Sequence, residues 1–301
     1  MIKKKVIDQI RVEPGKKINL KDFDTRWTLT SELKDAGKEA VKEKAAAMLE
    51  ANREELAKAQ ELLWASDIHS VLVVLQAMDA AGKDGIIKHV MSGINPQGCE
   101  VFSFKQPSAE ELDHNFLWRF MRRLPERGKI GIFNRSYYED VLVVKVHPEM
   151  IDAQKLPPGK RGDSFWQKRY DDINAFEHHL VRNGTLVLKF FLHISKDEQK
   201  KRFLERLDNP NKHWKFSEGD LAERAHWDDY NKAFEEAISA TSTKWAPWYI
   251  IPADHKWVSR TLISDVLVTA IKSLKLEFPS VSEEKKAALV EARRQLEQEE
   301  N

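Results

Sequence analysis

The sequence predicts an α/β fold, in which helices cover both faces of a central, mostly parallel sheet of five strands. Two observations lead to this prediction. Short runs of β-branched residues, Leu and Phe are typical of parallel strands that are buried on both faces. Segments with helical spacing of apolar residues separate these runs, and strands that alternate with helices favour βαβ units. The predicted strands are 70–76, 99–104, 129–134, 185–194 and 247–252.

The helices are predicted in order along the chain. Residues 31–65 are rich in Ala, Leu, Glu and Lys, which have high helix propensity. Residues 1–30 are polar and have no sustained period, so residues 1–66 should form an arm laid over the domain and then one long helix. Residues 281–301 are charged with few apolar positions, which predicts a solvated or oligomer-contacting helix. The remaining helices are predicted at 83–92, 108–122, 164–182, 196–207, 219–240 and 257–274.

Composition limits the class of protein. The 301 residues are 42% hydrophobic, enough for one large domain spanning 1–301. The 49 Lys and Arg nearly balance the 48 Asp and Glu, so we expect neither nucleic acid nor a membrane surface as a partner. Cys99 is the only cysteine, which excludes a disulfide framework and fits a reducing cytoplasm. No apolar run approaches the roughly 20 residues that span a bilayer.

The stretch "QAMDAAGKDG" (76–85) lies between the first strand and the next predicted helix. A strand, a Gly-Lys loop and a helix in this order are typical of a phosphate-binding P-loop. The pattern departs from the usual motif at two positions, because Ala77 replaces the first glycine and Asp84 replaces the magnesium-binding Ser or Thr. Lys83 would neutralise the phosphates. The other residues expected to contact phosphate or nucleotide here are Ala80, Ala81, Gly82, Asp84 and Gly85.

Asp79 lies inside this loop, where its carboxylate would face the bound phosphates. A bare anion would be repelled there unless a cation lies between them. Mg²⁺ held between Asp79 and phosphate oxygens removes the conflict. The alternative is that Asp79 only caps the helix or stabilises the loop.

A second candidate motif, "GIFNRSYYED" (131–140), follows the third predicted strand. P-loop enzymes place a second metal-orienting group at this point, beside the first loop at the carboxyl edge of the sheet. Asn134 holds the position usually given to Asp and could order a magnesium-bound water, while Arg135 could bind phosphate oxygens. Glu139 and Asp140 could restore the missing negative charge, or they could be ordinary acidic residues at a helix start.

A third candidate region, about 199–218, gathers cations around a helix end and a Pro-Asn turn. It is similar to the lid of a nucleotide kinase, where arginines close over the transferring phosphoryl group. A solvated basic face is the alternative. The cations are Lys201, Arg202, Arg206, Lys212 and Lys215. Lys105 and Arg119, weak signals alone, could clamp a phosphate-bearing acceptor.

The motifs together resemble the polyphosphate kinase 2 family of P-loop kinases. From about residue 6 to the end, "AMDAAGKDG", "NPQG", "SFKQPS", "LDHNFLWR", "GIFNRSYYEDVLV", "VHPE", "GTLVLKFFLHISKDEQKKRF" and "HWKFS" follow one another in the family's order. Asn134 together with "SYYED" is similar to the class that phosphorylates AMP as well as ADP.

The resemblance implies reversible phosphoryl transfer between inorganic polyphosphate and adenine nucleotides, with guanine nucleotides as alternative acceptors. It implies a three-layer α/β/α P-loop kinase fold with a helical lid, a basic channel for polyphosphate, Mg²⁺ (or Mn²⁺) as cofactor, and a homodimer or homotetramer. Carried over residue by residue, it implies catalytic roles for Asp79, Lys83, Arg135, Arg202 and Arg206. The metal would be bound by Asp79, Asn134 and Glu139.

Two other functions stay open on the residues alone. One is an ordinary nucleotide or small-metabolite kinase that uses ATP as donor. The other is a non-catalytic phosphate- or nucleotide-binding protein, which the imperfect loop and the long flanking helices favour.

Overall fold

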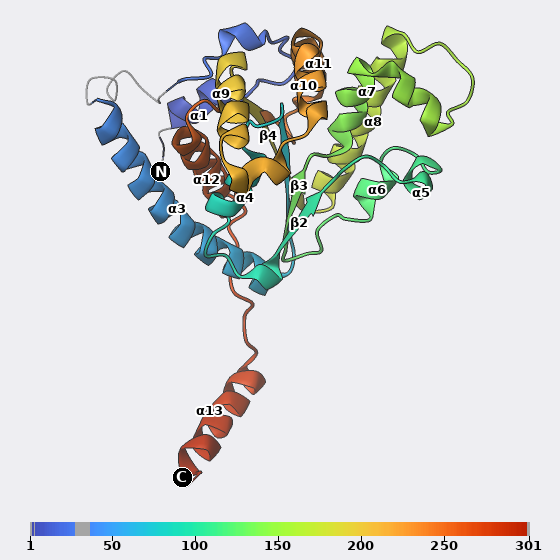
Figure 1. Cartoon of the computed structure of the whole chain (residues 1–301). Coiled ribbons are helices and arrows are strands. Elements are labelled where there is room, and N and C mark those ends of the chain that lie inside the picture. The colour runs from blue at the N-terminus through green and yellow to red at the C-terminus, as the bar shows by residue number, and fades with distance from the viewer. Residues whose placement is uncertain (1, 3, 28–36, 300–301) are drawn as a thin grey trace.

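The computed structural model describes residues 2, 4–27 and 37–299. Its centre is one sheet of five strands, all parallel, in the order β2–β3–β1–β4–β5 (Figure 1). The strands are β1 (Ser70–Ala77), β2 (Cys99–Ser103), β3 (Ile130–Asn134), β4 (Thr185–His193) and β5 (Trp248–Pro252). Each lies within one residue, at either end, of its predicted range. The predicted α/β class with a central sheet of five strands is therefore confirmed.

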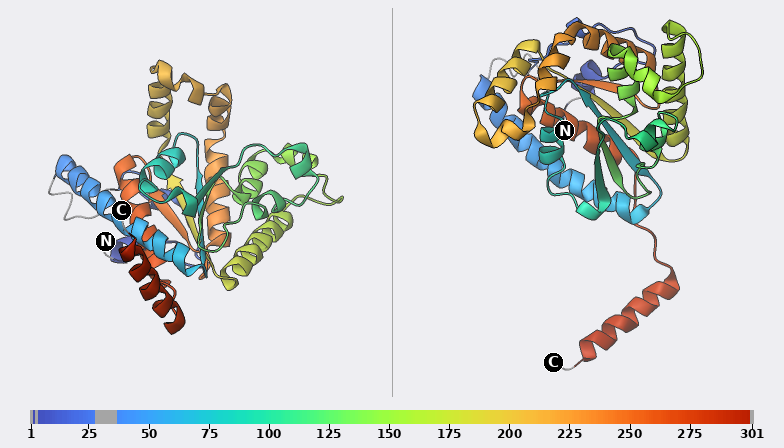
Figure 2. Two further views of the ribbon diagram at one scale, coloured as in Figure 1. Left: turned by 90° about the horizontal axis from the view of Figure 1, so that it is seen from below. Right: turned by 45° about the vertical axis from the view of Figure 1, so that its right-hand side comes forward.

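Helices cover both faces of this sheet, as Figures 1 and 2 show. On one face, α12 (Lys256–Lys272) packs against α3 (Lys38–Ser66) and α4 (Lys83–Val90). On the other, α8 (Asp163–Arg182) packs against β4 and against α11 (Trp227–Thr241). Because both faces are covered, every residue of β3 and β5 is buried, which explains their continuous apolar sequences.

The strand order places a switch point at the end of β1. β3 lies on one side of β1 and β4 on the other, so the chain leaves the centre in both directions. Such a point opens a crevice at the carboxyl ends of the strands, where ligands bind in open α/β sheets. The loops after β1 and β3 meet there.

Two predicted helices are each broken in two. Residues 108–122 form α5 (Ala109–Leu112) and α6 (Trp118–Met121), and residues 219–240 form α10 (Glu218–Ala225) and α11. In the first, the Asn115 side chain accepts a hydrogen bond from the backbone of Leu117, an interaction that competes with the helix. In the second, the chain turns at His226, whose ψ of 24° is not helical.

The connecting elements complete the description. α9 (Lys196–Leu207) and α10 project from the body and are joined by η5 (Pro210–Lys215), so most of the region predicted as a lid lies in this projection (Figure 2). The remaining helices are α1 (Lys4–Ile10), η1 (Leu20–Asp22), η2 (Pro96–Gly98), η3 (Tyr137–Val141), α7 (Val143–Val146), η4 (Pro148–Gln154) and α13 (Glu283–Gln298).

The arm and the tail differ in how they contact the body. The arm contains the unpredicted helix α1 and covers the β5 edge, where the Val12 N–H donates to the Trp248 carbonyl at 2.9 Å. α13 extends away from the body and none of its described residues is buried (Figure 1). Residues 31–36 of the first predicted helix lie outside the described residues. None of the described helices is long and apolar enough to cross a membrane.

Candidate active site

The loop after β1 carries the first predicted motif into the crevice. It ends at Gly82, the N-cap of α4, where φ is +114° and a side chain would be strained. Ala80 also has a left-handed backbone, with φ of +60°, which is uncommon for a residue with a side chain. Gly85 lies in the first turn of α4. Strained residues of this kind gather at ligand-binding sites, and the loop leads directly into a helix N-terminus.

Lys83 opens α4 and turns back toward the strand. Its Nζ donates to the Ala77 carbonyl at 2.9 Å. Burial lowers the pKa of Lys83, and the nearby Arg135 guanidinium lowers it further, while the carboxylates of Asp79, Glu139 and Asp84 oppose the shift. Two cations and three carboxylates thus meet around the loop after β1 (78–82), which is the loop predicted to bind phosphate.

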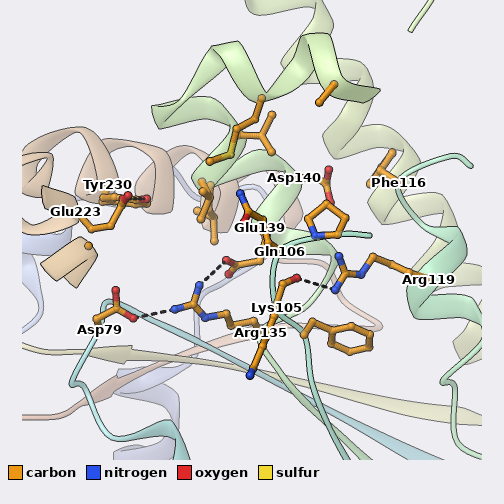
Figure 3. Close-up of a pocket in the computed structure, with 18 of the residues that line it drawn as sticks. Asp79, Lys105, Gln106, Phe116, Arg119, Arg135, Glu139, Asp140, Glu223 and Tyr230 are labelled. Atoms are coloured by element: carbon orange, nitrogen blue, oxygen red, sulfur yellow. Dashed lines mark hydrogen bonds and ion pairs between the residues drawn. The ribbon is translucent and has the colours of Figure 1, made fainter. Parts of the chain in front are cut away.

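Arg135 joins the first and second motifs. Its guanidinium lies 2.8 Å from Asp79 Oδ1 and 3.3 Å from Glu139 Oε2, and Figure 3 shows it between the two acids. The Glu139 carboxylate is the largest cause that raises the pKa of Arg135, with a smaller contribution from Asp79. The backbone of Arg135 is left-handed, with φ of +64°. The side chain therefore holds its place in the crevice through a strained turn and two ion pairs.

Asn134 connects the same two motifs at the end of β3. Its amide nitrogen donates to Asp84 Oδ1 at 3.0 Å and to Ser103 Oγ at 3.4 Å. Asp84, which replaces the usual hydroxyl, therefore contacts the residue that replaces the usual acid. Asp84 stands where a Ser or Thr is usual and Asn134 where an Asp is usual, and the two side chains are hydrogen-bonded to each other.

The predicted metal ligands fit Mg²⁺ only when phosphate shares the ion. Among the described residues, no group of three or more His, Cys, Asp and Glu is arranged to hold a metal. Asp79 and Glu139 are partly exposed on either side of Arg135, and the amide oxygen of Asn134 is a further acceptor. Mg²⁺ commonly takes one or two carboxylates, substrate phosphates and water, which matches this set.

A cavity of about 610 Å³ opens beside these groups. Asp79, Arg135, Glu139 and Asp220 line its polar end. Apolar side chains also line it, among them Phe104, Phe116, Phe120, Leu142, Val143 and Met150. This volume, with apolar walls beside charged groups, suits a small molecule that carries charge.

Lys105 and Arg119 line the same cavity and contact each other. Arg119 Nη2 donates to the Lys105 carbonyl at 2.7 Å, and its guanidinium lies 5.3 Å from the ring centres of Phe104 and Phe120. Its Nε is buried without a hydrogen-bond partner among the described residues. Such unpaired buried donors are rare in native structures.

The lid cations take different positions. Arg206 contacts Asp220 Oδ2 at 3.3 Å and the Lys215 carbonyl at 3.2 Å. Lys215 Nζ lies 3.9 Å from Asp84 Oδ2, beside the phosphate loop, whereas Lys212 is exposed on η5. Lys201 is exposed and lies within 4.0 Å of Glu198 and Glu205 on its own helix.

Arg202 does not lie where the sequence reasoning placed it. The prediction put it in the lid, facing the transferred group, but its side chain is buried. Its Nη1 donates to the carbonyls of Ala80 and Ala81, its Nη2 to those of Ala253 and Asp254, and its Nε to Glu198 Oε1. A guanidinium has five N–H donors, so these bonds occupy all of them. The i,i+4 pattern with Arg206 did not reveal this difference.

Several cavity residues were missed by sequence reasoning. Asp220 and Glu223 point from α10 into the cavity, and their i,i+3 spacing was the only available signal. Burial raises the pKa of Asp220, and the negative charge of Asp79 adds to the shift. Glu223 accepts a hydrogen bond from Tyr230 and lies 3.0 Å from His147 Nε2 (Figure 3 shows Glu223 and Tyr230).

Asp140 also lines the cavity, but its carboxylate is bound by Arg169 and Gln154. Arg169 Nη1 lies 3.3 Å from its Oδ1, and Gln154 donates to the same oxygen at 2.8 Å. Burial raises its pKa to about 6, against the lowering effect of Arg169. Glu139 and Asp140, adjacent in sequence, thus have different environments.

Comparison with known proteins gives one consistent family. Residues 39–279 match the model of the family described as polyphosphate kinase 2. The chain is 51% identical over 289 residues to an ADP-polyphosphate phosphotransferase of Rhodopseudomonas palustris, covering 96% of this chain and 97% of that protein. It is 49% identical over 269 residues to an AMP/ADP-polyphosphate phosphotransferase of Meiothermus ruber, covering 89% and 94%. A crystal structure of polyphosphate kinase 2 from Arthrobacter aurescens matches with a TM-score of 0.83 at 40% identity, covering 94% of this chain and 96% of that one.

Proposed function

Since this chain belongs to the polyphosphate kinase 2 family, we propose that it transfers the terminal phosphoryl group of inorganic polyphosphate to AMP or ADP. The observation that carries the proposal is that Asp79 of the loop after β1, together with Arg135 and Glu139, lines the cavity of about 610 Å³. The loop binds phosphate, and the cavity has the size and the apolar walls that a nucleoside needs. The two substrates would meet at Arg135.

The residues at this meeting point act by position and charge. A phosphate oxygen of the acceptor nucleotide attacks the terminal phosphorus of polyphosphate. The bond between that phosphorus and the bridging oxygen breaks, and the shortened polyphosphate leaves with the bridging oxygen. Lys83 and Arg135 offset the negative charge on the moving group, and Arg206 and Lys215 approach from the lid. Asp79 and Glu139 are the residues that would hold Mg²⁺, which supplies charge neutralisation at the phosphate oxygens. Asn134 could order a metal-bound water.

An unpaired cation on the α12 side of α4 supports a path for the donor. Arg260, on α12, has no hydrogen bond or ion pair among the described residues, and its Nη2 would lie 3.7 Å from a Cβ placed on Gly85. After burial, the charges of Arg53 and Arg202 lower the pKa of Arg260. Such a cluster of like charges is stabilised when an anion binds. Polyphosphate would therefore leave the phosphate loop toward Arg260, while the nucleotide enters from the cavity.

The Arg260→Ala variant tests this path. We expect the KM for long-chain polyphosphate to rise roughly 10-fold, with the KM for ADP unchanged, because a charge-assisted contact to phosphate is lost. Steady-state kinetics at fixed Mg²⁺ measure both constants. Arg182→Ala, an exposed change on the opposite face of the sheet, is the control. Equal KM values for polyphosphate in the two variants would contradict the proposed path.

Nucleotide chromatography tests the activity itself. The purified protein is mixed with Mg²⁺, long-chain polyphosphate and AMP, or separately ADP, with polyphosphate-free controls for dismutation of ADP. We expect ADP and then ATP from AMP, and ATP from ADP, only when polyphosphate is present. Product from ADP alone would limit the acceptors to ADP. Transfer from ATP with indifference to polyphosphate would identify an ordinary kinase, and binding without turnover a non-catalytic protein.

The exposed tail supports self-association. Leu289, Val290 and Leu296 of α13 are exposed, and no described residue of this helix is buried. Exposed apolar residues on a projecting helix favour contact with another copy. A homodimer or homotetramer should appear in analytical ultracentrifugation, and a monomer at micromolar concentration would contradict it. A cytoplasmic location remains a prediction from the single cysteine.

A further inference from the structure

Two buried side chains of α9 contact the phosphate loop from behind. Gln199 Nε2 donates to the Asp79 carbonyl at 3.0 Å, and Arg202 Nη1 donates to the carbonyls of Ala80 at 3.0 Å and Ala81 at 2.8 Å. Three consecutive carbonyls of the loop therefore bond to one helix that is about 120 residues away in the sequence.

These bonds fix the direction of the loop amides. In a trans peptide the C=O of one residue and the N–H of the next point in opposite directions. Because the carbonyls of Asp79 and Ala81 face α9, the N–H groups of Ala80 and Gly82 point away from α9. The N–H of Ala81 closes the turn by donating to the Met78 carbonyl at 3.3 Å. The bond from Arg202 also supports Ala80 in its left-handed conformation, which needs outside contacts to persist.

Arg202 anchors the loop to the end of β5. Its Nη2 donates to the carbonyls of Ala253 at 2.7 Å and Asp254 at 3.1 Å. The Asp254 carboxylate in turn accepts hydrogen bonds from the backbone of Ser195, just before α9, and from Thr25 of the arm. The loop is thus fixed to the segment that directly follows β5 and, through Asp254, to the start of α9 and to the arm.

Gln199 connects the loop to α10, the helix that follows η5. Its Oε1 accepts from Arg224 Nη1 of α10 at 2.8 Å, and the same nitrogen donates to the Lys196 carbonyl at 2.8 Å. The orientation of the Gln199 amide is determined by its partners, because a backbone carbonyl can only accept and a guanidinium can only donate. One planar amide therefore bridges Arg224 and the Asp79 carbonyl.

We propose that Gln199 and Arg202 are positioning residues for the proposed phosphoryl transfer: they orient the phosphate loop, and Gln199 links that orientation to the position of α10. Neither side chain needs to touch the transferred group. Arg202 acts through the geometry of its donors, not through its charge on the phosphoryl group. This inference rests on the proposed function for its kinetic readout only.

Three variants on α9 test the proposal. Gln199→Glu keeps the acceptor for Arg224 but has no N–H for the Asp79 carbonyl. Arg202→Lys keeps the positive charge but cannot reproduce the planar, five-donor arrangement. Lys200→Ala changes an exposed neighbour on the same helix and is the control. For each, kcat and KM are measured, together with thermal unfolding and hydrogen–deuterium exchange of a peptide covering 78–84.

We expect kcat to fall roughly 10-fold in Gln199→Glu and at least as much in Arg202→Lys, with the KM for nucleotide within about 2-fold of wild type. Exchange in 78–84 should be several-fold faster in both variants and unchanged in Lys200→Ala. Full activity in Arg202→Lys would overturn the proposal, and so would a lower kcat with unchanged loop exchange. If Arg202→Lys does not fold, Gln199→Glu decides by the same two readouts.

A fourth variant tests the link to the lid. Arg224→Met removes the partner of Gln199 Oε1, and the hydrogen bonds of Arg224 go to Lys196 and Gln199 rather than to the loop. We expect hydrogen–deuterium exchange of the peptide covering 78–84 to be faster than in the wild type. Unchanged exchange would overturn the link between Gln199 and α10. Loop exchange is measured without turnover. A wild-type protein that does not use polyphosphate would therefore disprove the proposed function and leave this test intact.

Discussion

The Asp79→Asn variant is expected to lose turnover by a factor of at least about 10², because it removes a charge at the point where phosphate, metal and Arg135 meet. Asn keeps the shape of the side chain but lacks the negative charge that would hold Mg²⁺. It also removes the ion pair to Arg135 at 2.8 Å, so the guanidinium is held by Glu139 alone. The measurement is kcat for ATP formation from polyphosphate and ADP at saturating Mg²⁺.

A matched control separates this effect from loss of structure. Asp67→Asn makes the same chemical change at the opposite end of β1, where the residue is exposed after α3 and has a left-handed backbone that Asn tolerates. It should retain normal turnover. Asp79→Asn should unfold at nearly the wild-type temperature, since Asp79 is partly exposed. Turnover within about 2-fold of wild type would remove Asp79 from the catalytic set.

Lys189→Met is expected to cost about 3–5 kcal/mol of unfolding free energy, because it breaks a buried ion pair. Lys189 Nζ lies 2.6 Å from Glu177 Oε2, and both side chains are 0% exposed. Burial lowers the pKa of Lys189, and Glu177 opposes the shift. The substitution conserves volume but leaves Glu177 as a buried carboxylate without its cation. Denaturant unfolding measures the change.

The second partner supplies the control for charge. In Lys189→Met combined with Glu177→Gln, the neutral amide still accepts from the hydroxyls of Tyr137 and Tyr138, which lie 2.9 Å from Glu177 Oε1 in the wild type. The double variant should be clearly more stable than Lys189→Met alone. The exposed Lys168→Met should change the free energy of unfolding by less than about 0.5 kcal/mol. If the free energy of unfolding of Lys189→Met lies within about 1 kcal/mol of the wild type, the ion pair between Lys189 and Glu177 contributes little.

This buried pair also bears on the active site. Tyr137 and Tyr138 directly follow Arg135 and Ser136, and their hydroxyls both bond to Glu177 on α8. Lys189 on β4 contacts Tyr138 as well, at 2.9 Å. The strained backbone at Arg135 is therefore followed by a segment fixed in the core. The loss of stability in Lys189→Met should therefore be accompanied by a loss of activity.

The sequence by itself determined the class of fold and the meeting of the first two motifs. Continuous apolar runs mark strands buried on both faces, and parallel strands bring their carboxyl ends to one edge. Asp79 after β1 and Arg135 after β3 could thus be placed side by side, and their carboxylate and guanidinium are 2.8 Å apart. This reasoning needs only local pattern and the geometry of a parallel sheet.

Only the tertiary structure decided which cations face the cavity and which support the loop. Arg202 and Arg206 are four residues apart on one helix, yet the first is buried against the carbonyls of Ala80 and Ala81 while the second contacts Asp220. Helical period gives the face of a residue but not the element that covers it. Four of the five donor bonds of Arg202 go to carbonyls in segments about 50 and 120 residues away, which no local pattern contains.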